Sequence, residues 1–190
     1  RGKDYYQKLL DTYPEHSYIT LSSIDLKARL EDLQAQLTKT LKEAEKFTEK
    51  TKPGKIENNQ QEQKRLQEEI DFLQDKISQG ATVVPLSGTL VLEYGKTSEN
   101  IYAGMDEEYR RYQPAIITWY ETAKHAFERG ADWQNMGGIE NDLKGGLYSF
   151  KSKFNPTIEE FAGEFNLPTN PLYHFSNLAY TIRKKLRSKH

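Results

Sequence analysis

The sequence predicts an α/β protein in which a mixed sheet is covered by helices and a long antiparallel pair of helices is inserted. Three observations predict this class. Strand-like and helix-like segments alternate after residue 80, as in a sheet with helical cover. Narrow apolar stripes at helical spacing fill residues 24–79. Only 36% of the 190 residues are hydrophobic and 29% are charged, as expected when part of the chain is a solvated helix pair.

The first 23 residues are expected to belong with the sheet. Residues 4–12 form a predicted helix that ends before Pro14. Residues 17–22 alternate like a strand, and Ser22 or Ser23 can cap the helix that follows.

Residues 24–79 are predicted to form an inserted coiled-coil hairpin, called the arm below. Its two apolar stripes are separated by Lys52-Pro53-Gly54-Lys55, which breaks the helix pattern after roughly 25 residues. Helices with such narrow stripes bury them by lying antiparallel, and they lack the wide apolar face needed to lie on a core, so we expect the arm to project. The stripes are Leu30, Leu33, Leu37, Leu41, Ala44 and Phe47 in the first helix and Leu66, Ile70, Leu73 and Ile77 in the second.

The remaining elements, in residues 80–190, make up the rest of the sheet and its cover. Aromatic residues recur every few positions from Tyr94 to Tyr180, so we expect the core to lie mostly in this half. Pro85 and Gly88 fit a bulge or an edge within the first of these strands. The predicted order is strand 82–94, turn 95–100, strand 101–103, helix 114–129, short buried strand 132–136, a loop and helix within 141–153, strand 157–165 and helix 172–186.

Composition and motifs exclude several classes of function. The net charge is −1, so an anionic partner would need a local cationic patch. The tail after Glu164 is such a patch, or it is the ordinary cationic end of a solvated helix. There is no cysteine, and the four histidines lack metal-ligand spacing, so we expect no metal. No P-loop, nucleophile elbow or dinucleotide fingerprint is present, and we expect no cofactor.

Seven short motifs follow one another through most of residues 80–175. They are Ser87-Gly88-Thr89, Glu93-Tyr94-Gly95-Lys96, Gln113-Pro114, Arg129-Gly130, Gly137-Gly138, Phe150-Lys151 and Gly163-Glu164. In these motifs and their order the chain resembles the second domain of the FemA, FemB, FemX and MurM aminoacyltransferases, some of which insert a helical hairpin at the place of residues 24–79. The resemblance implies a GNAT-like acyltransferase domain made of residues 1–23 and 80–190.

The resemblance implies a reaction and its partners. An amine of a peptidoglycan precursor, either lipid II or a nucleotide-linked muropeptide, attacks the ester of an aminoacyl-tRNA and forms an amide of the interpeptide bridge. Such an enzyme is cytoplasmic, with peripheral contact at the inner face of the membrane as a further partner. The family uses two such domains, so we expect this chain to be the carboxy-terminal portion and to be inactive alone.

Lys151 and Phe150 are the catalytic residues that the resemblance implies, with the ammonium stabilising the donor end. Without the resemblance, Lys151 would be an exposed lysine beside a buried phenylalanine. Gly137 and Gly138 would let backbone approach a substrate closely, and Arg1 would bind precursor phosphates.

Two weaker sets of candidates remain. Tyr94, Tyr102 and Trp133 either line the acceptor groove or belong to the core. The lysines at the arm tip either touch tRNA phosphates or form a solvated face, and they are Lys46, Lys50, Lys52 and Lys55.

Two other functions remain open. The first is a non-catalytic module that binds RNA or a protein through the arm. The second is a coenzyme A-dependent acetyltransferase, which is disfavoured because Asp106, Glu107 and Glu108 follow the strand where a pyrophosphate would have to lie.

Overall fold

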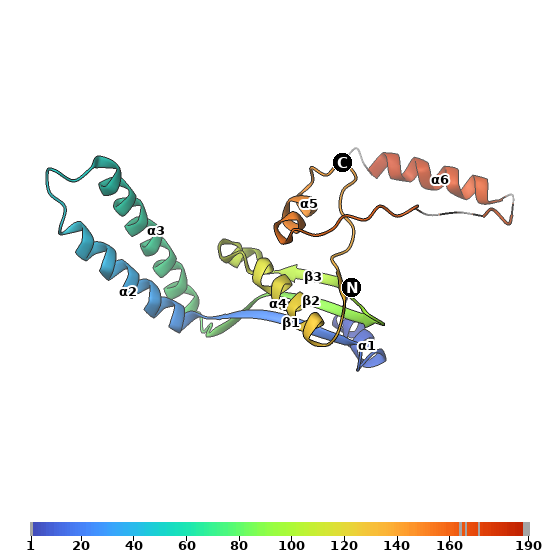
Figure 1. The fold of residues 1–190 in the computed structure, drawn as a ribbon, viewed down its shortest axis with the longest axis horizontal. Helices are drawn as coiled ribbons and strands as arrows, with labels where there is room; N and C mark the ends of the chain where they lie inside the picture. The colour runs from blue at the N-terminus through green and yellow to red at the C-terminus, as the bar shows by residue number, and fades with distance from the viewer. Residues whose placement is uncertain (1, 164, 166, 171, 188–190) are drawn as a thin grey trace. The chain divides into compact units, whose positions relative to one another are not determined.

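The computed structural model describes residues 2–163, 165, 167–170 and 172–187, which fall into two compact units, Arg1–Phe154 and Asn155–His190. The first unit contains the sheet and the arm, and the described residues of the second include the helix α6 (Figure 1). The elements of the first unit are α1 (Lys3–Thr12), β1 (Ser17–Asp25), α2 (Leu26–Ala44), α3 (Pro53–Ser78), β2 (Val83–Tyr94), β3 (Thr97–Met105), the 3-10 helix η1 (Glu107–Tyr112), α4 (Pro114–Glu128), β4 (Trp133–Asn135), α5 (Gly146–Lys151) and the 3-10 turn η2 (Ser152–Phe154).

The four-stranded sheet has the order β1-β2-β3-β4 and is mixed, as expected. The first three strands are antiparallel, and β4 runs parallel to β3 over three residue pairs. The hairpin turn is tighter than predicted, because Tyr94 pairs with Thr97 and Gly95 takes a left-handed φ of 58°. A bulge occurs opposite Ser22 and Ser23, where Pro85 lies, as the sequence suggested.

Hydroxyl groups join α4 to one face of the sheet. Thr118 donates to Ser22 at 2.7 Å and also contacts Ser87, while Thr89 and Thr122 are 2.7 Å apart. Tyr102 lies on the opposite face, because it pairs with Leu90 whereas the neighbouring Thr89 faces α4. That opposite face is packed by α1 through Tyr5 and Tyr6.

The arm consists of α2 and α3, which lie antiparallel and leave the sheet where β1 ends and β2 begins (Figure 1). Asp25 caps α2 by accepting from the amides of Lys27 and Ala28. α2 has 19 residues and ends at Ala44, so it is shorter than the roughly 25 residues predicted, and Phe47 lies in the connecting loop. Pro53 begins α3 at its first turn, where its missing N–H costs nothing.

The main apolar cluster lies at the base of the arm, so the expectation that the core belongs mostly to the second half is wrong. The cluster continues into the domain through Leu86 and Tyr109, because η1 packs beside α3. The expectation rested on the aromatic residues after Tyr94, and several of these are exposed, including Phe161 and Phe175. The buried members of the cluster are Leu26, Leu33, Leu66, Ile70, Leu73, Leu86 and Tyr109.

The second unit contains α6 (Leu172–Arg187). The leucine, isoleucine and phenylalanine side chains of α6, including Phe175 and Leu178, are exposed. The predicted strand 157–165 is wrong for residues 157–163, which form no strand and are exposed, while residue 164 lies outside the described residues.

Candidate functional site

The candidate site begins where β3 and β4 part. These parallel strands pair only from Thr97 to Glu99 with Trp133 to Asn135, and the chain then turns away through Gly137 and Gly138. The Asn135 side chain accepts from the Gly137 amide at 2.8 Å, and Gly137 has a φ of 74°. A side chain at Gly137 would therefore strain the turn.

Lys151 is buried against this turn. It ends α5, only 6% of it is exposed, and its Nζ donates to the Gly138 carbonyl at 2.6 Å. The ammonium also lies 5.8 Å from the ring centre of Trp119 on α4. The alternative that Lys151 is an exposed helix lysine is therefore wrong.

The charge state of Lys151 is set by two opposing effects. Burial lowers the pKa of Lys151, and the nearby carboxylate of Glu140 raises it. Backbone hydrogen bonds, first its own and then those of Leu147 and Tyr148, lower the pKa of Glu140, and the charge of Lys151 lowers it further. The two groups thus favour the charged form of each other.

Glu140 also orders the start of α5. Its two carboxylate oxygens accept from the amides of Leu147 at 3.1 Å and Tyr148 at 3.0 Å. A Cβ atom at Gly145 would occupy the space of the Glu140 carboxylate, whereas one at Gly146 would meet nothing within 4 Å. Gly145 is therefore needed for Glu140 to reach α5.

An aromatic cluster lies beside Lys151. Trp119 packs against Phe150 with ring centres 5.3 Å apart, and Phe150 packs against Phe154 at 5.6 Å. Phe150 is thus partly buried in contact with α4. The aromatic cluster extends from Lys151 to Phe154, which lines a cavity.

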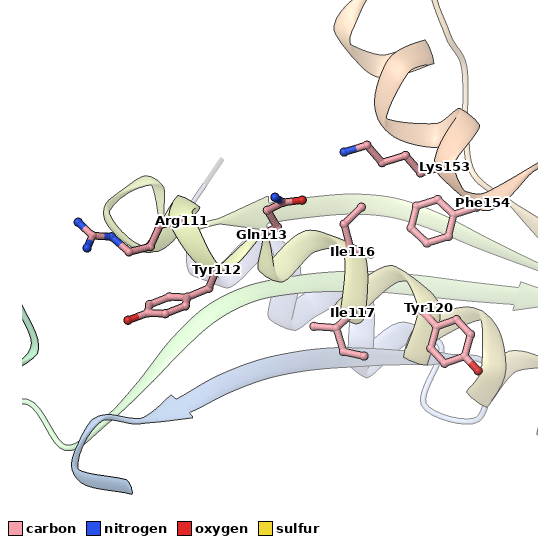
Figure 2. A pocket seen from close by; sticks show the side chains of 8 residues that line it. All are labelled: Arg111, Tyr112, Gln113, Ile116, Ile117, Tyr120, Lys153 and Phe154. Atoms are coloured by element: carbon pink, nitrogen blue, oxygen red, sulfur yellow. The ribbon is translucent and has the colours of Figure 1, made fainter. Parts of the chain in front are cut away.

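That cavity, which we call the α4 groove, is open and has a volume of about 660 Å³. Figure 2 shows Arg111 and Tyr112 at one end of the groove and Phe154 and Tyr120 at the other, with the two isoleucines between these ends and Lys153 near Ile116. Phe154 belongs both to the groove and to the aromatic cluster. The groove is lined by Arg111, Tyr112, Gln113, Ile116, Ile117, Tyr120, Lys153 and Phe154.

The other predicted substrate residues are not gathered at Lys151. Tyr94 is 91% exposed, at the hairpin turn, and Trp133 is 63% exposed, so β4 is not the buried strand that we expected. Tyr102 hydrogen-bonds Tyr5 at 3.0 Å on the face of the sheet away from α4. Arg1 lies outside the described residues. Their roles stay predictions.

The arm tip contains a second cavity, of about 650 Å³. Two of the predicted lysines, Lys46 and Lys55, line it, and Lys55 pairs with Glu43 at 3.0 Å. Lys50 and Lys52 are exposed in or beside the connecting loop. The cavity adds Lys39 and Lys42, which sequence reasoning missed although both lie one or two turns from Lys46 on the same helix pattern.

Sequence reasoning also missed Trp119, Glu140 and the contact between Gly145 and the Glu140 carboxylate. Glu140 lies in a stretch without secondary structure. The amides that donate hydrogen bonds to it are seven and eight residues away, and no local sequence pattern predicts hydrogen bonds at that spacing. A Gly-Gly pair before a short helix was the one available signal for Gly145.

Among the described residues, no group of three or more histidine, cysteine, aspartate or glutamate side chains could hold a metal ion. In the same part of the chain, no helix combines the length and the apolar character needed to cross a bilayer.

Comparisons with known proteins agree along nearly the whole chain. The model of the FemAB family matches residues 1–181. The chain is similar to the lipid II:glycine glycyltransferases of Staphylococcus epidermidis, at 29% identity over 92% of this chain and 45% of the relative, and of Staphylococcus haemolyticus, at 26% identity over 91% and 45%. It is also similar to the crystal structure of FemX, with a TM-score of 0.50 and 22% identity over 80% of this chain and 41% of that chain, which concerns the fold alone. The chain therefore spans less than half the length of the curated relatives it matches.

Proposed function

The chain belongs to the FemAB family, and on that basis we propose that it forms part of an aminoacyltransferase that builds the interpeptide bridge of peptidoglycan. The donor is an aminoacyl-tRNA, and the acceptor is the stem-peptide amine of a precursor of the lipid II type. The observation that carries the proposal is the family match over residues 1–181, supported by similarity to lipid II:glycine glycyltransferases. Residues 1–23 and 80–190 form a GNAT-like domain, and residues 24–79 are its inserted arm.

The reaction makes modest chemical demands. The neutral amine attacks the ester carbonyl carbon, a C–N bond forms, and the bond from that carbon to the tRNA ribose oxygen breaks. The proton lost by the amine ends on the ribose hydroxyl, so no cofactor is consumed. Catalysis then consists of positioning the amine and stabilising the negative charge that develops on the carbonyl oxygen.

Lys151 supplies that stabilising charge. An ammonium has three N–H donors, and the Gly138 carbonyl takes one of them, which fixes the direction of the group. Burial beside Trp119 lowers the local dielectric, so a fixed positive charge there acts more strongly than it would in water.

The test is transfer of labelled glycine from glycyl-tRNA to lipid II by the complete natural enzyme. Lys151→Ala should lower kcat by about 10²–10³-fold, the usual loss for one charge-stabilising donor. Lys144→Ala, an exposed lysine of the same loop, is the matched control and should leave kcat unchanged. Equal kcat values for the two variants would remove Lys151 from the mechanism.

The arm tip is the second contact with tRNA in this proposal. Lys39, Lys42, Lys46 and Lys55 gather around one cavity, and lysines clustered in this way release counterions when they meet phosphates. Reversing Lys42 and Lys46 to glutamate should weaken tRNA binding and make the slope of binding against salt shallower by about two phosphate contacts. Lys64→Glu, on an outer face of α3 with its side chain 80% exposed, should have little effect. Equal losses of tRNA affinity in the two variants would mean that the net charge of the protein, and not the arm tip, attracts the tRNA.

The alternative of a non-catalytic module predicts that the arm binds RNA while Lys151 is dispensable. The enzyme carrying this chain acts on the cytoplasmic side of the membrane, in peripheral contact with it, because that is where aminoacyl-tRNA meets the precursor.

A further inference from the structure

β4 connects the sheet to the turn that holds Lys151. The strand has three residues, lies at the edge of the sheet and pairs with β3 over Thr97 to Glu99. Two residues beyond it the chain turns at Gly137, and the next carbonyl, that of Gly138, accepts from the Lys151 ammonium at 2.6 Å. A strand this short adds little pairing free energy, so the position of that carbonyl depends on what else anchors β4.

The side chain of Gln134 anchors β4. Gln134 pairs with Ser98, and side chains of residues two positions apart on a strand lie on the same face, so Gln134 meets Asn100 there. Its Nε2 donates to the Asn100 Oδ1 at 3.2 Å and to the Asn135 carbonyl at 3.3 Å. An amide nitrogen carries two hydrogens, and both are used here. One side chain therefore joins β3 to the last residue of β4.

Asn135 converts this anchored position into the shape of the turn. Its Oδ1 accepts from the Gly137 amide at 2.8 Å, which is the local hydrogen bond by which asparagine closes a turn. A Cβ atom at Gly137 would lie 3.7 Å from the Lys151 Nζ, so the turn lies directly against the ammonium. The direction of the Gly138 carbonyl thus depends on Asn135, and the direction of the ammonium depends on that carbonyl.

The amides of Asn100 and Gln134 are costly to keep where they are. Asn100 is 9% exposed, and Ser98 beside it on β3 is fully buried. Within the part of the chain that the structure describes, the Asn100 Nδ2 and the Gln134 Oε1 are buried atoms without a hydrogen-bond partner. An unpaired buried polar atom carries a desolvation penalty that apolar side chains of similar shape would avoid. Polar groups kept against stability in this way are typical of positions that a functional site requires.

We propose that Gln134 and Asn135 are positioning residues for Lys151. Asn135 acts through the turn after β4, and Gln134 acts by tying β4 to Asn100. Together they hold the Gly138 carbonyl where it directs the ammonium toward the reacting ester. The inference rests on the proposed function for the reaction and goes beyond it, because it assigns the residues that set the geometry of the cation.

The Gly138 carbonyl also affects the charge of the ammonium. A hydrogen bond to the charged form of a group favours that form, so loss of this bond should lower the pKa of Lys151 further than burial already does. The carboxylate of Glu140 acts on the ammonium from the loop before α5, and α4 presents the uncharged Trp119 to it. A substitution at Asn135 alters neither of these side chains, so a shift that it causes is attributable to the turn.

The test measures glycine transfer from glycyl-tRNA to lipid II by the complete natural enzyme. Asn135→Ala removes the acceptor of the Gly137 amide and should lower kcat by about 10–100-fold, because misplacing a catalytic group by about 1 Å costs up to that factor. KM should change little, since Asn135 acts on the ammonium rather than on substrate binding. The alkaline limb of kcat/KM should move to lower pH. Asn135→Asp keeps an acceptor oxygen at that place and should recover most of the kcat.

The contact with Asn100 is tested by Gln134→Met, which keeps the length of the side chain but has no donor. It should lower kcat and move the alkaline limb in the same direction as Asn135→Ala. Asn141→Ala, an exposed asparagine in the loop before α5, is the matched control and should behave like the unaltered enzyme. Melting temperatures report on the fold of each variant. A lowered melting temperature with kcat and the limb unchanged would show that the contacts serve stability alone, and would overturn the proposal.

A second measurement is independent of turnover. Acetic anhydride acetylates the unprotonated amine of Lys151, and the rate of this labelling against pH, followed by mass spectrometry, gives the pKa of Lys151. In Asn135→Ala the labelling should begin at lower pH than in the unaltered enzyme. If the labelling shifts but the unaltered enzyme transfers nothing from aminoacyl-tRNA, the positioning role stands and the proposed function fails. If transfer proceeds and neither the labelling nor kcat differs in Asn135→Ala, the positioning role is wrong and the proposed function stands.

Discussion

At the scale of single residues, the site depends on a lysine whose position and charge are set by different neighbours. The Gly138 carbonyl and Trp119 fix the position of the Lys151 ammonium. Burial works against its charge, and Glu140 works for it. Since Glu140 also accepts the first amides of α5, one carboxylate couples the helix start to the charge of the lysine.

The ammonium form of Lys151 is the active form, and burial lowers its pKa below 10.5, the ordinary pKa of lysine. As pH rises, glycine transfer should therefore start to fall at a pH below 10.5. Glu140→Gln removes the charge that raises this pKa, so the alkaline limb should move to still lower pH. Glu128→Gln, at the far end of α4, should leave the limb in place. The measurement is kcat/KM against pH, and an unmoved limb in Glu140→Gln would contradict the coupling.

The same shift affects stability with a defined sign. Between the lowered pKa of Lys151 in the folded state and 10.5 in the unfolded state, the unfolded chain binds more protons. The contribution of Lys151 to stability therefore rises with pH across that window and is lost as pH falls through the lowered pKa.

A pair of neighbouring glycines offers a test of geometry. Gly145→Ala places a methyl group where the Glu140 carboxylate lies, so the carboxylate must leave the α5 amides. In the Gly145→Ala variant, the alkaline limb of kcat/KM should therefore move to lower pH, as in Glu140→Gln, and kcat should fall. Gly146→Ala meets open space and should behave like the unaltered enzyme, and a larger effect at Gly146 than at Gly145 would show that the Glu140 contact is unimportant.

At the scale of elements, the two helices of the arm are joined to each other by a buried carboxylate as well as by leucines. Glu69 of α3 is 4% exposed and accepts from Arg29 of α2 at 2.8 Å and from Arg65 at 3.1 Å. Burial and then the Glu69 charge raise the pKa of Tyr112, at the end of η1, to about 12. The base of the arm is therefore joined to the residues that lead into the α4 groove.

Glu69→Ala should lower the free energy of unfolding by about 2–3 kcal/mol. Removing one partner of a fully buried ion pair costs ~3–5 kcal/mol, and the smaller figure follows because Arg29 and Arg65 remain partly in water. Glu68→Ala, one residue earlier and exposed, should cost less than about 0.5 kcal/mol. Urea denaturation of both variants measures the difference, and similar midpoints would mean that the leucine stripes alone hold the arm.

At the scale of the whole molecule, the two units differ in how much of their surface is covered. The first contains the sheet, the arm cluster and both cavities. In the second, residues 155–163 are exposed and outside regular structure, and the leucine, isoleucine and phenylalanine side chains of α6 are exposed as well. Exposed backbone without secondary structure is the preferred substrate of proteases.

A glutamate-specific protease should therefore cut this chain first after Glu159 or Glu160, both exposed, and release a piece ending there. Glutamates within α3, including Glu68 and Glu69, should be cut later because the helix must open first. Mass spectrometry of early digestion products tests this order, and first cuts inside the arm would contradict it.

The sequence by itself determined the features that depend on local spacing. Leucine steps of three and four gave the helix pair, and Pro53 and Gly130 marked where helices begin or end. The motifs around Gly137-Gly138 and Phe150-Lys151 were enough to identify the family that the match over residues 1–181 established.

Only the tertiary structure decided what depends on contacts between distant segments. The burial of Lys151 requires Trp119 and Gly138, which lie 32 and 13 residues away, and no periodicity encodes such a meeting. The main apolar cluster lies at the base of the arm, and not where it was predicted, for the same reason. Leu86 and Tyr109, which are distant from the arm helices in sequence, complete it. Burial and charge state are set by what packs on a side chain, and that is a property of the folded molecule rather than of local order.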